Sequence, residues 1–171
     1  MRHTIPCAAA LLLLTIPALA GDGPLVEEKR VLTLAGAKAV AAAAAAEARR
    51  HNAGGAIAVV DDGGNLLYLE RLDDTFAAAS NIAIGKARSA ANFRRDTRVF
   101  EDAIKNGRTS LIANPELLPL QGGVAIVVDG KVVGGIGVAG ASSAQQDEDF
   151  ATLAAAVVAR GVAEARTAGA R

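Results

Sequence analysis

The chain has 171 residues, 51% of them hydrophobic, and its 18 basic residues balance its 18 acidic ones. This neutral balance provides no electrostatic footprint for nucleic acid or an acidic lipid surface, so we expect neither partner. With one cysteine and two histidines in the whole sequence, a disulfide within the chain is excluded and a structural zinc site is not expected.

The first twenty residues have the pattern of a secretory signal peptide. A charged start at Arg2 precedes a short apolar stretch over residues 8–16, and a small-x-small site at residues 18–20 precedes Gly21. The apolar stretch is too short to span a membrane. We therefore expect a cleaved signal over residues 1–20, a single domain over residues 21–171 without membrane insertion, and a periplasmic or secreted location.

A helix and a hairpin are predicted first along the domain. Thr33 is the expected N-cap of a helix that runs to about Arg50 and ends at the Asn-Ala-Gly-Gly sequence of residues 52–55. The continuous apolar run over 56–60 predicts a buried strand. A second strand over 66–70 returns after a five-residue Asp-Asp-Gly-Gly-Asn turn.

Two helices and an irregular segment are predicted next. Apolar residues spaced three and four apart predict a helix over 80–93, and a shorter helix is expected over 97–105, closed by Asn106 and Gly107. Residues 108–121 contain two prolines, which favour an extended and irregular path.

The second hairpin has the strongest local signal. Asp129 and Gly130 stand between two valine-rich runs and favour a type I′ turn. A capping box at residues 143–146 then predicts a helix that runs to about Arg160 and stops at Gly161. The element order predicts an α/β protein of the α+β type, with a central antiparallel sheet of about five strands flanked by helices, in the profilin-like or PAS-like style.

A glycine motif in the second hairpin invites a dinucleotide-binding interpretation. Residues 135–140 read Gly-Ile-Gly-Val-Ala-Gly, which fits G-x-G-x-x-G between a strand and a helix. However, the strand is one arm of an antiparallel hairpin, and the acidic residue expected about twenty residues further on is absent. We therefore expect these glycines to let a helix or a ligand approach the strand closely.

Four polar residues are candidates for a site, each with two interpretations. Lys86 lies on the apolar stripe of its helix, so it either snorkels past the core edge or faces an anionic ligand group. Arg71 and Asp73 follow a strand, where they either form a salt bridge that fixes the chain reversal or point into a pocket. His51 either complements the dipole at the end of its helix or binds heme iron as a single ligand.

Several sequence blocks resemble the GlcG/HbpS-like heme-binding proteins, a family that also occurs as the C-terminal domain of some corrinoid adenosyltransferases. These blocks follow one another in order along nearly all of the predicted mature chain. They are Val59-Val-Asp-Asp-Gly-Gly-Asn65, Glu70-Arg-Leu-Asp-Asp74, Lys86-Ala-Arg-Ser-Ala90, Gln121-Gly-Gly123 and Gly134-Gly-Ile-Gly-Val-Ala-Gly140, with Gln146-Asp-Glu148 after them.

The resemblance implies a compact domain that assembles into homo-oligomers, reaching octamers, and binds heme or a related tetrapyrrole. It implies that Lys86 and Arg88 pair with propionates, and that Thr97, or alternatively His51, reaches the iron. Where the family usually has a proline after Gly-Gly-x, this chain has Ala125, and it has Asp96 and Thr97 where Pro-Thr is frequent, so the resemblance does not fix the precise shape of the pocket. The remaining expected contacts are Arg71, Asp73, Gly122 and Gly123.

Two other functions stay open at this stage. The protein is either an enzyme or accessory subunit acting on a small organic acid or corrinoid, or a structural oligomer without a ligand. In the enzyme, Arg71 and Lys86 would bind the anion and Asp73 or Asp147 would act as acid or base. A binding protein is favoured over an enzyme, because no catalytic constellation stands out in the residues.

Overall fold

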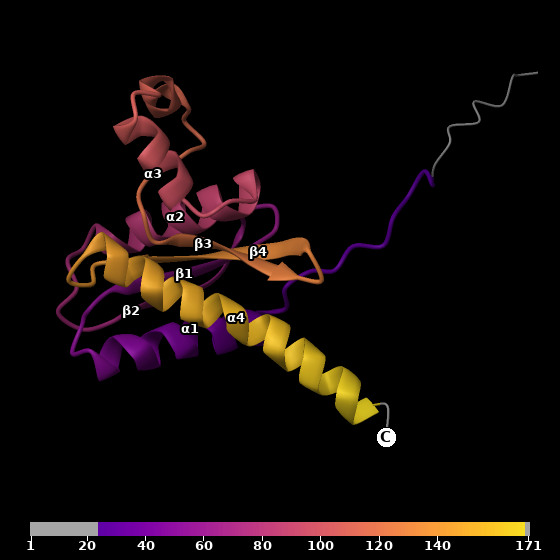
Figure 1. The fold of residues 1–171 in the computed structure, drawn as a ribbon. Helices are drawn as coiled ribbons and strands as arrows, with labels where there is room; N and C mark the ends of the chain where they lie inside the picture. The colour runs from indigo at the N-terminus through magenta and orange to yellow at the C-terminus, as the bar shows by residue number, and fades with distance from the viewer. Residues whose placement is uncertain (1–23, 170–171) are drawn as a thin grey trace, which may run out of the picture.

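The computed structural model describes residues 24–169 and shows a sheet covered by helices on both faces (Figure 1). The predicted signal peptide lies outside the described residues. Among the residues described, no helix is both long and apolar enough to cross a membrane. The elements are α1 (Leu34–Arg50), β1 (Ala56–Asp61), β2 (Leu66–Arg71), α2 (Ala79–Phe93), α3 (Arg98–Lys105), the 3₁₀ helix η1 (Thr109–Ala113), β3 (Gly123–Val128), β4 (Lys131–Ala139) and α4 (Ala144–Gly169).

The sheet has the strand order β2-β1-β4-β3, and all of its pairings are antiparallel. This confirms the α+β class and both hairpins. The predicted number of about five strands was slightly too high, because the sheet of the described chain has four. Residues 108–121 add no strand to it, since they form η1 and an irregular segment.

The helices form two layers with different chemistry. α1 and α4 pack together on one face, while α2 covers the other (Figure 1). The core under α1 and α4 contains large side chains such as Ile57, Ile136 and Phe150. The core under α2 consists almost entirely of alanines, including Ala83 and Ala87. Because alanine is small, α2 lies close to the strands.

Glycines of the sheet complete this close contact with α2. A methyl group built on Gly137 would lie 2.6 Å from the backbone nitrogen of Ala87, and one built on Gly123 would lie 2.5 Å from the carbonyl oxygen of Lys86. Gly135 faces α2 in the same way. The formal G-x-G motif is therefore a packing surface for a helix, as the antiparallel hairpin predicted.

Two local predictions are confirmed, a helix N-cap and a hairpin turn. The Thr33 hydroxyl accepts a hydrogen bond from the Gly36 N–H at 3.1 Å, as expected of an N-cap. Asp129 and Gly130 both have positive φ, 50° and 74°, as a type I′ turn requires. These interactions depend on neighbours within a few residues, which is why the sequence revealed them.

The last helix is longer than predicted. It was expected to stop at Gly161, but α4 continues to Gly169. Glycine costs about 1 kcal/mol relative to alanine inside a helix, and residues 162–169 contain no proline and include three alanines, a glutamate and an arginine, which favour a helix. The single glycine is therefore too weak a signal to end the helix.

The sheet has two distinct ends, which we name the loop end and the hairpin end. At the loop end, β1 begins and β2 and β4 finish, so residues 51–55, 71–76, 121–123 and 140–143 come together there. The hairpin end contains the turns at 61–65 and 129–130. α4 starts at the loop end and runs past the hairpin end (Figure 1).

Candidate functional site

The loop end collects most of the residues that the sequence singled out. His51 closes α1, Arg71 and Asp73 follow β2, and Gly122 and Gly123 lead into β3. Two hollows are present at this end, and the loop that joins β2 to α2 contributes residues to both. We name them the arginine hollow and the lysine hollow.

The arginine hollow has a volume of about 380 Å³. Arg49 contributes an ion pair with Glu70, with 3.1 Å between the guanidinium nitrogen and the carboxylate oxygen. Arg71 and Asp73 are exposed, and among the described residues they form no ion pair with each other. The salt bridge considered for the chain reversal is therefore not formed. The lining residues are Arg49, Ala53, Glu70, Arg71, Leu72 and Asp73.

The lysine hollow has a volume of about 330 Å³ and largely apolar walls. Phe76, Ile82 and Leu120 line it, and Phe76 is 53% exposed. Lys86 and Asp147 also belong to its lining, although both are buried. This hollow therefore combines apolar surface with one buried ion pair.

The positive charge of the Lys86 ammonium group is compensated by a carboxylate inside the protein. Its Nζ donates to Asp147 Oδ2 and to the carbonyl oxygen of Val138, both at 2.8 Å, and the residue is only 4% exposed. The other carboxylate oxygen of Asp147 accepts the Ala141 N–H at 2.9 Å. Lys86 thus neither snorkels to solvent nor presents a free cation. Gly122, with φ of 112°, passes over Nζ without a side chain.

Lys86 and Arg88 are not brought together as a pair. Arg88 is exposed, and its Nε donates to the carbonyl oxygen of Gly64 at 3.1 Å. Gly64 belongs to the turn at the hairpin end, whereas the Lys86 ammonium lies beside the loop end. In this arrangement the two side chains do not converge on one ligand.

Thr97 is fully buried beneath the segment that leads into β3. Its hydroxyl donates to the carbonyl oxygen of Leu120 at 2.5 Å and accepts the Gly123 N–H at 2.9 Å. The hydroxyl forms no capping bond to α3, although Thr97 precedes that helix. For Thr97 to reach a ligand, the segment over residues 120–123 would have to move away.

His51 is the accessible candidate for binding a metal. Its side chain is 49% exposed, and its Nε2 lies 3.1 Å from Glu47 Oε1. The imidazole ring also packs near Phe150, with 5.5 Å between ring centroids. Histidines that bind metals commonly hydrogen-bond a carboxylate through the other ring nitrogen. The i,i+4 spacing of Glu47 and His51 was the signal for this pair that the sequence reasoning missed.

The sequence reasoning also missed a polar network beside the start of α3. Glu148 accepts hydrogen bonds from Arg98, at 3.2 Å, and from the Gln121 side chain, while Glu101 accepts the Gln121 N–H at 2.6 Å. Burial raises the pKa of Glu101, but hydrogen bonds from Lys105 and Gln121 outweigh it, so the net pKa lies below its usual value. The carboxylate therefore stays ionised and holds the rim of the lysine hollow. Among the described residues, no group of three or more His, Cys, Asp or Glu side chains could hold a metal ion.

Sequence comparison relates most of the chain to known proteins. The family model described as "Haem degrading protein HbpS-like" matches residues 32–156. Protein GlcG of Escherichia coli K12 is 47% identical over 76 residues, which are 44% of this chain and 57% of GlcG. The chain thus matches little more than half of that relative. An uncharacterized 15.0 kDa protein of Citrobacter freundii is 35% identical over 127 residues, 72% of this chain and 89% of that protein.

Solved structures show the same fold. A double mutant of HbpS from Streptomyces reticuli is 32% identical with a TM-score of 0.73, covering 89% of this chain and 98% of that one. A complex named PduOC:Heme is 26% identical with a TM-score of 0.66, covering 74% of this chain and 94% of that one. The family model matches well over half of the sequence, and the solved structures have the same fold as this chain. The chain belongs to the HbpS-like family.

Proposed function

We propose that this protein binds heme, or a closely related tetrapyrrole, at the loop end. The observation that carries the proposal is the half-exposed His51, which Glu47 holds at the same end of the sheet as the arginine hollow. Membership of the HbpS-like family and the likeness to a protein solved with heme support it. A single histidine is sufficient to hold heme iron, so the missing cluster of metal ligands does not count against this site.

The described residues fit the chemical parts of a heme group. The neutral imidazole of His51 would bind the iron, with Glu47 accepting the other ring N–H and fixing the ring. Arg71, exposed at the arginine hollow, would pair with a propionate. Phe76 offers exposed aromatic surface at the same end. When bound, heme would supply a redox-active iron.

Titration of hemin into the purified protein tests this proposal. We expect a shift of the Soret band that saturates at one hemin per chain. The H51A variant is expected to lose most of the shift, because it removes the accessible nitrogen ligand. The T97V variant is the matched control and is expected to keep the shift, because the Thr97 hydroxyl is buried and bonded to backbone.

Two outcomes would change this assignment. A featureless titration at micromolar protein would contradict heme binding itself. If folded T97V protein lost the shift while H51A kept it, the iron ligand would be Thr97 and the segment over residues 120–123 would have to open. Circular dichroism of both variants verifies that they are folded.

Action on a small organic acid or corrinoid is the alternative function. The buried pair of Lys86 and Asp147 in the lysine hollow is the observation that favours it. However, Asp147 already neutralises Lys86, which weakens its attraction for a free carboxylate. A thermal-shift screen separates the two functions, because a ligand raises the melting temperature by mass action. Stabilisation by small carboxylates but not by hemin would favour the alternative. A structural oligomer predicts that no ligand stabilises it.

The proposal includes export and self-assembly. The signal-peptide pattern of residues 1–20 supports a periplasmic or secreted location, and the family resemblance supports a homo-oligomer that reaches an octamer. Detection of the protein that begins at Gly21 outside the cytoplasm would support cleavage and export. Its native mass would give the number of subunits.

A further inference from the structure

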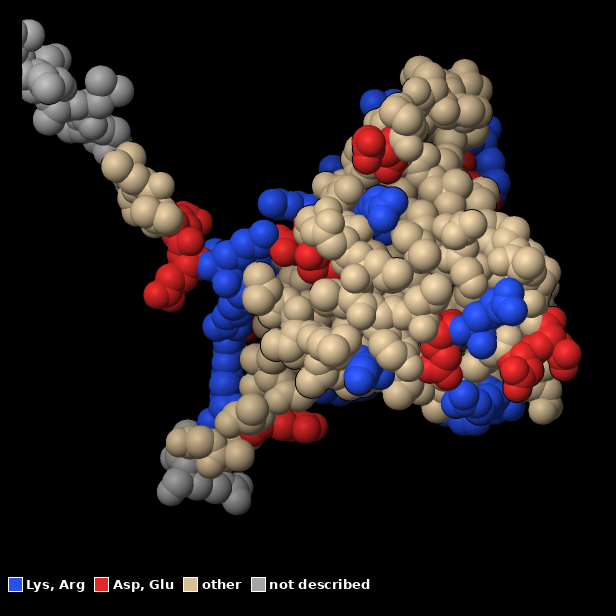
Figure 2. All heavy atoms as spheres, turned by 180° about the vertical axis from the view of Figure 1, so that it is seen from behind, with Lys and Arg blue, Asp and Glu red and all other residues tan. Residues whose placement is uncertain are grey.

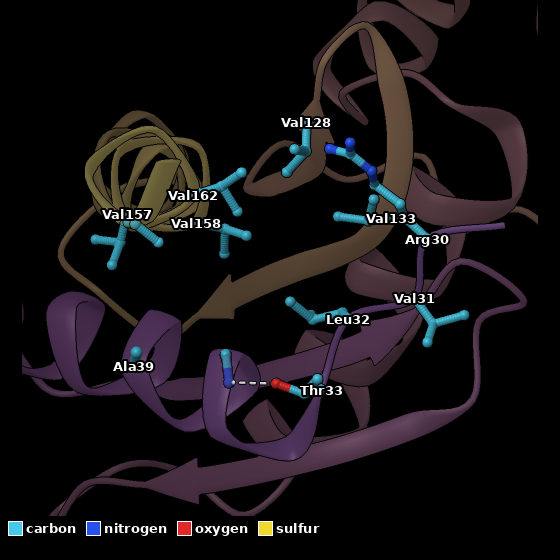
Figure 3. A pocket seen from close by; sticks show the side chains of 13 residues that line it. Arg30, Val31, Leu32, Thr33, Ala39, Val128, Val133, Val157, Val158 and Val162 are labelled. Carbon is cyan, nitrogen blue, oxygen red and sulfur yellow. Dashed lines mark hydrogen bonds between the residues drawn. The ribbon is translucent and has the colours of Figure 1, made fainter. Parts of the chain in front are cut away.

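A third hollow, the valine groove, lies at the opposite end of the sheet from His51. It has a volume of about 380 Å³ and lies between the start of α1, the β3–β4 hairpin and the distal half of α4 (Figure 3). Its walls are built largely from aliphatic side chains of these elements. They include Val31, Leu32, Val128, Val133, Val158 and Val162.

The groove contains one charged side chain. Among the described residues that line it, only Arg30 is charged, at the edge where the chain enters α1. Thr33 is the one hydroxyl, and it already accepts the Gly36 N–H (Figure 3). The groove therefore offers apolar surface along its length and a cation at one end. This arrangement suits an amphiphile better than a polar metabolite.

This edge of the groove carries more positive than negative charge, because two arginines share the single carboxylate of Asp129. Its carboxylate is hydrogen-bonded to the guanidinium groups of Arg30 and of Arg166, the latter at 2.6 Å. Together these three side chains carry one net positive charge. The same bonds hold the N-terminal segment and the distal half of α4 around the groove. Figure 2 shows blue side chains, with red ones among them, along the segment that leads into α1 and the protruding part of α4.

The net positive charge at this edge favours some possible occupants of the valine groove over others. A second copy docked through the same groove about a two-fold axis would bring its own net positive edge into the contact. Like charges brought together disfavour that contact. A ligand with one negative charge and an aliphatic chain neutralises the edge and covers the valines at the same time.

We propose that the valine groove binds a free fatty acid. The aliphatic chain lies between α1 and α4, and the carboxylate binds Arg30 and Arg166. This site is independent of heme binding at the loop end, so either can fail without the other.

Blocking the groove tests the position of the aliphatic chain. A methyl group built on Gly161 meets no atom within 4 Å, and Gly161 lines the groove, so G161L adds a side chain there whose first carbon has free space. We expect laurate binding, measured by isothermal titration calorimetry, to fall at least tenfold in G161L. The matched control is A156L, on an exposed position of α4 that does not line the groove, and it is expected to bind as the wild type does.

Removing the cation tests the carboxylate contact. R30Q is expected to weaken laurate about tenfold, as the loss of one charge-assisted hydrogen bond does, and to leave 1-dodecanol unchanged. The control R160Q removes an exposed arginine of α4 outside the groove and is expected to change neither ligand.

Three results would overturn the proposal. The first is that wild-type protein shows no laurate binding, and the second is that G161L binds laurate as tightly as A156L does. The third is that G161L, but not A156L, reduces the oligomer size in sedimentation, which would make a second copy the occupant. Laurate that stays bound when one equivalent of hemin is added supports two separate sites, whereas displacement contradicts them.

Discussion

Replacing Gly137 with alanine is expected to lower the free energy of unfolding by about 3 kcal/mol, the upper part of the range for overpacked cores. The added methyl group would lie 2.6 Å from the backbone nitrogen of Ala87, and closer still to the carbonyl oxygen of Ala83. Both atoms belong to the backbone of α2, so no side-chain rotation can relieve the clash. Urea denaturation followed by circular dichroism measures the loss.

A second glycine provides the matched control for this effect. Gly161 lies inside α4, and a methyl group there meets no atom within 4 Å. G161A is therefore expected to raise the free energy of unfolding by about 1 kcal/mol, because alanine is the better helix former. If G137A were as stable as the wild type, α2 could not be in direct contact with β4.

The buried ion pair gives the other large expected effect. D147A is expected to lower the free energy of unfolding by about 3–5 kcal/mol, because it leaves the Lys86 ammonium buried without its partner. It also removes the acceptor of the Ala141 N–H. K86M is expected to cost less, because Asp147 keeps that bond and lies in the first turn of α4, where the helix dipole favours a carboxylate.

The double variant separates pairing from simple loss of contacts. K86M/D147A is expected to recover much of the stability lost in D147A, since neither charge then remains buried alone. The exposed pair of Arg98 and Asp102 is the control, and D102A is expected to cost less than about 1 kcal/mol. Additive losses in the double variant would show that Lys86 and Asp147 are not coupled. Urea unfolding of the wild type, K86M, D147A and the double variant completes the cycle, and D102A is measured beside them.

The parts of the fold that depend on neighbours in sequence were predictable. The Asp129-Gly130 turn and the Thr33 cap use interactions within three residues, so their signals are visible without a structure. The glycines of β4 were also interpreted correctly, because the hairpin excluded a parallel strand. α4 was predicted too short, since the cost of Gly161 is small against the rest of a long helix.

The candidate site was predictable only in part, because its contacts join distant segments. Lys86 pairs with Asp147, 61 residues further on, and no local sequence pattern predicts that pair. The hydrogen bonds of Thr97 with residues 120–123 also join distant segments, so the sequence does not predict them. By contrast, Glu47 and His51 are four residues apart on one helix, so their contact could have been found.

The central claim is that heme binds at the loop end of the sheet, and hydrogen exchange measured by mass spectrometry tests it for any oligomer size. With one equivalent of hemin, we expect slower exchange in peptides that cover residues 49–55 and 71–76. Peptides that cover residues 127–133, at the hairpin end, are expected to exchange as before. Slower exchange at the hairpin end alone, or no change at the loop end while the Soret band shifts, would contradict the claim.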